Sequence, residues 1–152
     1  MTTRPHQVFE DLARIGALLS QDIDTRLREE CGLSLNGFRV LLTASGRAPF
    51  CRVQEVADAL GLSVGGASQA VDRLERRGLC GRRSNPRDRR SSLVDVTPAG
   101  HGLLDDATLV YADALDALVG VPLAEPELGE LARLLGVLRF AVGPEGRLAP
   151  AG

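Results

Sequence analysis

The apolar residues of this chain recur at two different spacings, and the spacing predicts the secondary structure segment by segment. Spacings of three and four residues, typical of amphipathic helices, predict helices at 7–30, 38–45, 53–60, 64–77, 98–119 and 127–142. A period of two places Val94 and Val96 on one side of a strand over 91–97, which we expect to pair with a strand over 79–84. The predicted fold class is therefore mainly α with a small β-hairpin.

Residues 53–77 have the form of a helix-turn-helix. The shorter helix ends at Gly61, and Ser63 is placed to cap the longer helix over 64–77. Two helices joined by a short turn with a glycine are typical of this motif, whose second helix, the recognition helix, enters the DNA major groove. Because a hairpin follows over 79–97, which we call the wing, the whole is expected to be a winged helix-turn-helix.

The recognition helix has two unlike faces. At 100° per residue its apolar residues fall on one side, namely Val64, Ala67, Ala70, Val71 and Leu74. The other side carries Gln69, Arg73 and Arg76, with Ser68 on the flank. Gln69 suits the edge of adenine, and Arg73 or Arg76 suits guanine or phosphate. This face therefore favours contact with DNA over simple exposure to solvent.

Charge is distributed unevenly along the 152 residues. The net charge is −2, a value that does not by itself predict a nucleic-acid binder. From Arg73 to Arg90, however, eight arginines stand against two acidic residues, and after Thr97 three arginines stand against eight. A basic stripe on an otherwise acidic protein is the electrostatic signature of phosphate binding.

Part of this basic stripe lies in the loop between the two strands, "NPRDRR". We expect Arg87, Arg89 and Arg90 to lie at the tip of the wing, because arginine suits the narrow and strongly negative minor groove. Asp88 cannot favour DNA by charge, so we expect it to hold a neighbouring arginine in position. Asp72 on the recognition helix would likewise repel phosphate, and we expect it to form a salt bridge with an arginine of the wing.

Several short motifs follow one another between Val53 and Gly100: Asp72-Arg73-Leu74-Glu75, Gly78-Leu79, Asp88 with Arg90 two residues on, and Leu93 to Gly100. In this order the segment resembles the MarR family of bacterial transcriptional regulators. The resemblance implies a homodimer that binds a pseudo-palindromic operator in double-stranded DNA, with Arg90 in the minor groove. It also implies a repressor that releases DNA when a small aromatic or phenolic effector binds. Phe38 and Tyr111 are candidates to line an effector pocket, although both also suit the core or an interface.

The remaining helices predict a dimer interface. Those over 7–30 and 98–142 have more apolar surface than one winged helix can cover, so we assign them to dimerisation. Residues 34–97 form the predicted DNA-binding lobe, and 1–142 form a single domain that a disordered tail follows over 143–152. The alternative is a self-sufficient monomer with a helical cap.

Other functional classes find little support in the sequence. The two histidines, His6 and His101, lie far from each other, and the adjacent Asp105 and Asp106 point in different directions on a helix. We therefore expect no enzyme, no metal site and no cofactor. Apolar runs fall short of the roughly 18 residues of a membrane span, so we expect a cytoplasmic protein.

Two further interpretations stay open. The winged helix could be a protein-interaction module that does not bind DNA, although such a wing has no need of three arginines. Alternatively, the regulator could sense oxidants through a cysteine, with Cys51 or Cys31 as candidates. The peroxide sensors of the family carry that cysteine within the first helix, whereas no cysteine lies between Met1 and Glu30 here and Cys31 stands at the end of that helix. Cys80 stands on a strand where an apolar residue would serve.

Overall fold

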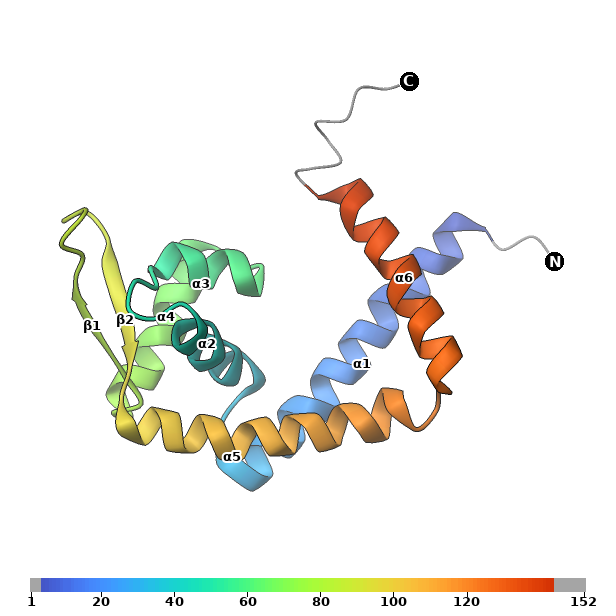
Figure 1. The fold of residues 1–152 in the computed structure, drawn as a ribbon, viewed down its shortest axis with the longest axis horizontal. Coiled ribbons are helices and arrows are strands. Elements are labelled where there is room, and N and C mark those ends of the chain that lie inside the picture. The colour runs from blue at the N-terminus through green and yellow to red at the C-terminus, as the bar shows by residue number, and fades with distance from the viewer. Residues whose placement is uncertain (1–3, 144–152) are drawn as a thin grey trace, which may run out of the picture. The chain divides into compact units, whose positions relative to one another are not determined.

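The computed structural model describes residues 4–143 and divides the chain into two compact units, Met1–Ala114 and Leu115–Gly152. In chain order the elements are α1 (Pro5–Cys31), α2 (Leu35–Gly46), α3 (Val53–Leu60), α4 (Val64–Arg76), β1 (Cys80–Ser84), β2 (Ser92–Val96), α5 (Pro98–Leu115), the π-helix η1 (Asp116–Gly120) and α6 (Glu125–Val142) (Figure 1). The predicted fold class, mainly α with a hairpin, is confirmed. Apart from Gly143, the predicted disordered tail lies outside the described residues.

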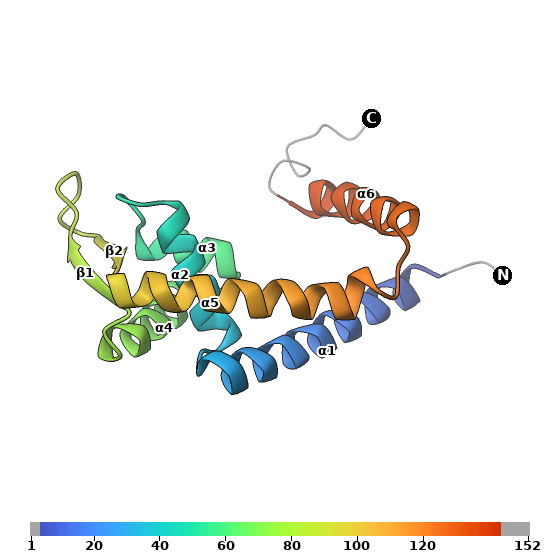
Figure 2. The ribbon, with the colours of Figure 1, turned by 60° about the horizontal axis from the view of Figure 1, so that its bottom comes forward.

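The core of the first unit forms where the C-terminal part of α1, the three short helices and the hairpin meet. Figure 2 shows α2, α3 and α4 gathered beside the hairpin. The largest fully buried side chains come from each of these elements and include Leu27, Phe38, Leu41, Val56, Val71, Leu93 and Val94. Burial of one such side chain contributes about 1.5–3 kcal/mol, so this cluster fixes α4 and the hairpin against each other.

Polar side chains and a glycine set the ends of the short helices. The Ser34 Oγ accepts a hydrogen bond from the Gly37 N–H at 3.0 Å and caps α2, and the Ser63 Oγ accepts from the Gly66 N–H at 3.0 Å and caps α4. Gly61 ends α3 with a φ of +66°, a conformation that favours glycine. The turn between α3 and α4 is therefore specified locally by Gly61 and Ser63.

The hairpin is antiparallel, with the partners Cys80 and Val96, Gly81 and Asp95, Arg82 and Val94, Arg83 and Leu93, and Ser84 and Ser92. Leu93 and Val94 are neighbours on β2 and yet both are buried, whereas a period of two predicts one buried face. Both α2 and α3 lie against β2, and the chain just before α3 pairs with the edge of β2 that β1 leaves open. Arg52 forms an isolated bridge with Leu93, and the Val94 N–H donates to the Cys51 carbonyl at 2.8 Å. β2 is thus an inner strand, with β1 along one edge and the chain at residues 51–52 along the other.

The start of α5 is joined to the end of α4. The Thr97 Oγ1 donates to the Gly78 carbonyl at 2.7 Å and accepts from the Gly100 N–H at 3.0 Å. A side chain at Gly100 would collide with the carbonyl oxygen of Leu79, so a glycine is required at this close approach. The long helix therefore begins in fixed contact with the segment that ends the recognition helix.

The second unit differs from the sequence prediction at two points. The helix predicted over 98–119 is α-helical only to Leu115 and continues as η1. The last helix begins at Glu125, two residues before its predicted start, because Glu127 accepts a hydrogen bond from the Ala124 N–H at 2.7 Å and so caps it. Among the described residues no single helix is long and apolar enough to span a membrane, although Pro98–Gly120 and Glu125–Val142 together have the length and composition for one bent span.

Candidate nucleic-acid interface

α4 buries one face and exposes most of the predicted recognition residues. Its buried residues are Ala67, Ala70, Val71 and Leu74. Gln69, Arg73 and Arg76 are exposed, and Ser68 is half-buried. Val64 was predicted on the apolar side but is 48% exposed, because it is the first residue of α4 and precedes the turn that packs on the core. The polar face is thus continuous and open to a partner.

One arginine ties β1 to α4. The Arg82 guanidinium forms ion pairs with Asp72 and, at 3.0 Å, with Glu75. It also donates to the Oγ and the carbonyl oxygen of Ser68 at 2.9 and 3.0 Å. Partial burial opposes the charge of Arg82, but the two carboxylates outweigh this effect and raise its pKa above the ordinary value. Because a planar guanidinium with several partners has one orientation, the wing and the recognition helix are held together as one unit.

The structure identifies the arginine that pairs with Asp72. The expected salt bridge with a wing arginine is formed by Arg82, a residue that sequence reasoning did not single out. Asp72 and Glu75 lie three positions apart and so share one side of the helix. Two acidic residues on one side of the helix, followed by a strand with the adjacent arginines Arg82 and Arg83, are the sequence signal that would have indicated Arg82.

The wing loop, residues 85–91, is held in shape by its own hydrogen bonds. Asn85 is only 5% exposed, and its side chain donates to the Ser91 Oγ at 2.9 Å and accepts from the Arg87 N–H at 3.0 Å. The Asp88 carboxylate accepts from the Arg90 N–H at 3.0 Å. Asp88 therefore forms a local turn with the backbone of Arg90, and its expected contact with an arginine side chain is not among the ion pairs of the described residues.

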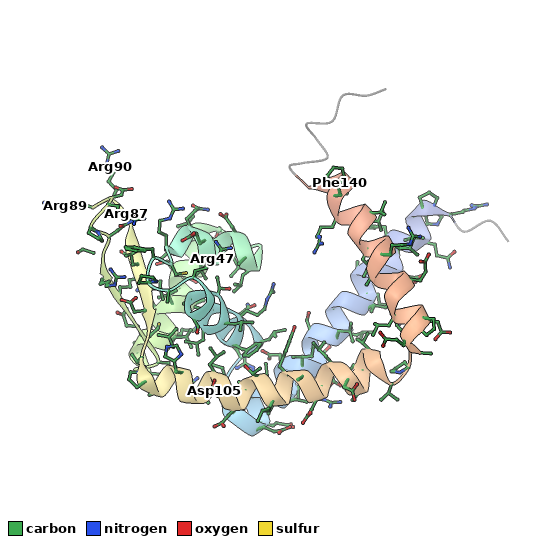
Figure 3. The ribbon with its side chains drawn as sticks, in the orientation of Figure 1. Arg47, Arg87, Arg89, Arg90, Asp105 and Phe140 are labelled. Carbon is green, nitrogen blue, oxygen red and sulfur yellow. The ribbon has the colours of Figure 1, made fainter. Side chains whose placement is uncertain are left out.

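The three arginines of the wing loop have different surroundings. Arg89 and Arg90 are exposed at the end of the hairpin (Figure 3), and neither forms an ion pair with an acidic residue of the described chain. Arg87 instead lies over the ring of Phe50, with 4.2 Å between its Cζ and the ring centroid. Arg83 on β1 approaches the same ring, with 5.9 Å from its Cζ to the centroid. Within residues 4–143, therefore, Arg87 has an aromatic partner, whereas the side chains of Arg89 and Arg90 have no ion-pair or cation–π partner.

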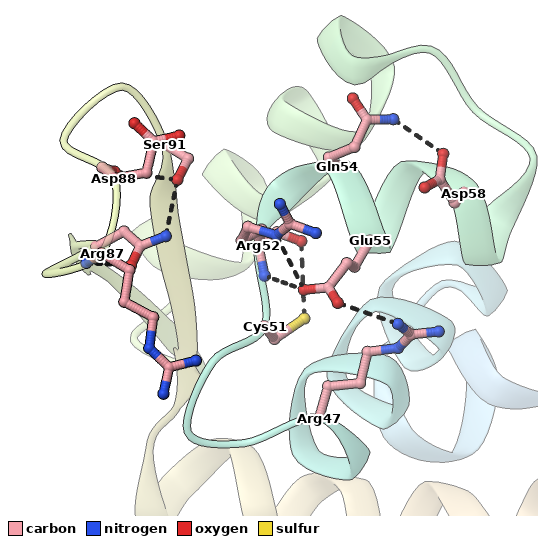
Figure 4. A network of polar contacts seen from close by, with 10 residues as sticks. Arg47, Cys51, Arg52, Gln54, Glu55, Asp58, Arg87, Asp88 and Ser91 are labelled. Carbon is pink, nitrogen blue, oxygen red and sulfur yellow. Dashed lines mark hydrogen bonds and ion pairs between the residues drawn. The ribbon is translucent and has the colours of Figure 1, made fainter.

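A second set of polar contacts fixes the start of α3 beside the wing (Figure 4). Glu55 accepts from the Arg52 N–H at 2.8 Å and from the Arg47 guanidinium at 3.2 Å. The backbone hydrogen bond is the largest cause of the lowered pKa of Glu55, and burial opposes it. Sequence reasoning missed this network, although a glutamate at the third position of a helix is a known capping signal.

The cysteines lie in surroundings that disfavour the thiolate. Burial raises the pKa of Cys80 to about 11 and also raises the pKa of the fully buried Cys51. Cys31 is less buried, and its pKa is raised by burial and by the nearby Asp106 and Glu30 carboxylates. Because oxidant-sensing cysteines need a lowered pKa and access to solvent, this geometry does not favour the redox interpretation.

A family model and a sequence relative both match this chain and point to the same family of regulators. A sequence model of the MarR family matches residues 32–91, the span from the end of α1 to the end of the wing loop. The chain is 30% identical over 130 residues to the HTH-type transcriptional regulator MhqR of Bacillus subtilis, and the match covers 84% of this chain and 86% of that protein.

Solved structures share the fold. Sco3205, a MarR family transcriptional regulator from Streptomyces coelicolor in complex with DNA, has a TM-score of 0.83 at 22% identity, covering 95% of this chain and 94% of its own. CouR from Rhodococcus jostii RHA1, bound to p-coumaroyl-CoA, has a TM-score of 0.75 at 27% identity, covering 88% of this chain and 90% of its own.

Proposed function

The chain belongs to the MarR family of transcriptional regulators, and from this premise we propose that it is a homodimeric repressor that binds a pseudo-palindromic operator in double-stranded DNA. The observation that carries the proposal is the contact of Arg82 with Asp72 and Glu75. This contact holds the wing against α4, so the two elements that read adjacent grooves of DNA approach it as one preorganised unit.

In this proposal α4 lies in the major groove. Gln69 reads adenine, while Arg73 and Arg76 bind guanine or phosphate, because these side chains are exposed on the same polar face. Ser68 keeps its hydroxyl proton free to donate, since its oxygen already accepts from Arg82. Gly65 and Gly66 leave the first turn of the helix without side chains, and they let the backbone come close to DNA.

The tip of the wing lies in the neighbouring minor groove. Arg90 is the principal contact, with Arg89 beside it, because both are exposed and carry charge that no acidic residue of the described chain neutralises. The Asp88 carboxylate presents Arg90 by fixing its N–H. Asp72 acts in the same indirect way through Arg82, so both aspartates orient the wing without touching DNA.

The proposed dimer interface consists of helices outside the DNA-binding lobe at 34–97. α1 exposes an apolar stripe made of Val8, Phe9, Leu12, Ile15 and Leu18. α6 exposes a stripe made of Leu131, Leu134, Leu135, Leu138 and Val142, and Val137 and Phe140 are exposed on its other side. Patches of this extent on a monomer mark interaction sites. A second copy of the chain would cover them, since a two-fold symmetric operator calls for a two-fold symmetric protein.

We propose that a small aromatic or phenolic molecule relieves repression. CouR was solved with p-coumaroyl-CoA, a phenolic acyl thioester, at 27% identity to this chain. In this chain the Phe38 and Tyr111 rings lie 4.8 Å apart between centroids, so α5 and α2 meet through an aromatic pair. A protein of this kind binds ligands without transforming them, so we assign it no enzymatic activity, and we place it in the cytoplasm with the chromosome it regulates.

Selection of genomic DNA fragments tests the proposal. Purified protein is mixed with fragmented DNA of the source organism at about physiological salt, and the retained fragments are sequenced. We expect enrichment of a short inverted repeat with half-sites about one helical turn apart, and an affinity that falls steeply as salt rises. Salt-insensitive association with proteins, without an enriched repeat, would instead favour the protein-interaction module.

A further inference from the structure

We propose that Phe50 and Arg87 form a strut that sets the position of the wing, so that Arg87 is a positioning residue and not a DNA contact. The inference rests on the proposed function, because it concerns how the wing is presented to DNA. It changes the role of one of the three arginines expected at the wing tip, and it adds Phe50, which no sequence motif indicates, to the residues that govern DNA affinity.

The backbone that carries Phe50 is fixed on the body of the DNA-binding lobe. The Cys51 carbonyl accepts from the Val94 N–H of β2 at 2.8 Å. On the other side of Phe50, the Pro49 carbonyl accepts from the guanidinium of Arg83 on β1. Phe50 therefore stands between two points at which its loop is bound to the hairpin, and its ring offers a fixed face to the wing loop.

Arg87 is fixed at both of its ends. Its N–H donates to the Asn85 side chain at 3.0 Å, and Asn85 itself is buried and bound to Ser91. Its guanidinium lies over the Phe50 ring at 4.2 Å, well within the range of a cation–π interaction. Figure 4 shows the Arg87 side chain directed back from the loop, away from the end where Asp88 lies. This arginine points toward the protein and not beyond the tip.

The wing needs support on this side. A two-stranded hairpin is marginally stable by itself, and side chains alternate between its two faces. Arg82 holds one face against α4, whereas Arg83, the next residue along β1, points to the loop that carries Phe50. The stack of Arg87 on Phe50 extends this second attachment to the wing loop. Support from both faces limits the motion of Arg89 and Arg90, and so reduces the entropy that these side chains lose on binding DNA.

The two possible roles of Arg87 predict different salt dependences. Each phosphate neutralised by an arginine contributes about 0.9 to the slope of log affinity against log salt concentration. A strut neutralises no phosphate, so its loss lowers the affinity and leaves this slope unchanged. The experiment measures operator affinity over a range of salt for wild type, Phe50→Leu, Arg87→Gln, the double variant, Phe50→Tyr and Arg89→Gln.

We expect Phe50→Leu and Arg87→Gln each to weaken binding about two- to fivefold per half-site, the effect of one exposed cation–π contact. The double variant should bind no more weakly than Phe50→Leu, because that substitution already removes the Arg87 contact together with the more distant approach of Arg83 to the ring. Phe50→Tyr keeps the ring and should bind like wild type, so a normal affinity here shows that the position tolerates substitution. Arg89→Gln, the matched arginine of the same loop, should reduce the salt slope.

A reduced salt slope for Arg87→Gln, or additive effects in the double variant, would overturn the strut. Melting temperatures of all variants identify any loss of folding. If a Phe50 variant is unfolded, the salt slopes of Arg87→Gln and Arg89→Gln by themselves distinguish the strut from a DNA contact. Failure of the proposed function looks different, because wild-type protein would then show no specific, salt-sensitive binding. Failure of the strut leaves wild-type binding intact.

Discussion

Arg82 of β1 reaches across to Asp72 of α4, a residue ten positions earlier in the chain, and the two form an ion pair. Glu75 pairs with the same guanidinium at 3.0 Å, so one cation compensates two carboxylates on the helix proposed to enter DNA. Without Arg82 these carboxylates would face the phosphates unpaired. The ion pair therefore holds β1 against α4, and in the proposed complex with DNA it would also offset the repulsion between these carboxylates and the phosphates.

Arg82→Ala should weaken operator binding by about tenfold or more, because it frees two carboxylates and releases the wing, and hydrogen bonds to charged groups are worth about 1.5–3 kcal/mol. Asp72→Asn in the Arg82→Ala background should recover part of the affinity, since it removes one of the freed charges. Titration of labelled operator DNA measures both effects. Asp22→Asn, which breaks the separate pair of Asp22 with Arg26 on α1, is the control and should bind like wild type. Equal binding by Arg82→Ala and wild type would contradict the positioning role.

Arg90→Ala should reduce specific DNA affinity by at least about tenfold, the cost of one good contact to DNA. It should also reduce the salt slope, because a minor-groove arginine interacts strongly with the phosphates. The dimer should stay intact, which size-exclusion chromatography with light scattering can check. A variant that binds like wild type would remove the minor-groove role.

Ile15→Glu should dissociate the dimer with little change in the fold of each subunit. The reason is that Ile15 is 54% exposed in the single chain, so a glutamate there meets solvent in the monomer but apolar surface in the dimer. Analytical ultracentrifugation measures the dissociation, and circular dichroism checks the helix content. Leu42→Glu is a suitable control, because Leu42 is a similarly exposed residue of the DNA-binding lobe. A dimer as stable as that of wild type would exclude the α1 stripe from the interface.

Stability should fall in acid partly through Glu55. Its pKa is lowered in the folded protein, mainly by the Arg52 N–H, so the folded state favours the charged form more than the unfolded state does. The stabilisation is therefore complete above the ordinary pKa of a glutamic acid and is lost as pH falls through the lower folded value. Urea unfolding at several pH values should show a weaker acid dependence for Glu55→Gln than for wild type. An identical dependence in the two proteins would contradict the capping role.

Hydrogen peroxide should leave operator binding unchanged at neutral pH. The pKa values of Cys31, Cys51 and Cys80 are all raised, that of Cys80 to about 11, so the thiolate that an oxidant attacks is disfavoured at each of them. Gel-shift experiments before and after peroxide, with mass spectrometry of the cysteines, test this expectation. Release of DNA that a Cys51→Ser variant abolishes would restore the redox interpretation.

The sequence predicts much of this lobe because its boundaries depend on local chemistry. Ser63 and Gly61 specify the turn between α3 and α4 through their own backbone and side chain, and α3 occupies the residues expected for it. The predicted start of α6 was wrong by two residues, because the Glu127 carboxylate accepts a hydrogen bond from the Ala124 N–H and so sets the beginning of the helix. Apolar spacing does not report such a contact.

The parts of the candidate site that the sequence could not predict depend on packing between distant segments. Arg87 looks the same in the sequence as Arg89, and only the position of the loop that carries Phe50 distinguishes them. Likewise, the second edge of β2 pairs with the chain at Arg52, about 40 residues earlier, a contact between segments that are distant in the sequence. The alternation of apolar and polar residues predicts a hairpin strand with one neighbouring strand, whereas β2 is paired both with β1 and with the chain at Arg52.

Gly100 packs closely on the Leu79 carbonyl and Thr97 is hydrogen-bonded to Gly78, so the first turn of α5 is fixed to the segment that follows the recognition helix. A movement at the far end of α5 is therefore transmitted to that helix. An 18-residue helix is about 27 Å long. If the far end of α5 is displaced by about 2 Å, the helix tilts by about 4°, and the rigid joint passes this tilt to the end of α4. A repressor whose two recognition helices must match the spacing of two half-sites can thus be detuned from a distance. A molecule that bends the dimer body slightly would spoil the fit without touching any residue that contacts DNA.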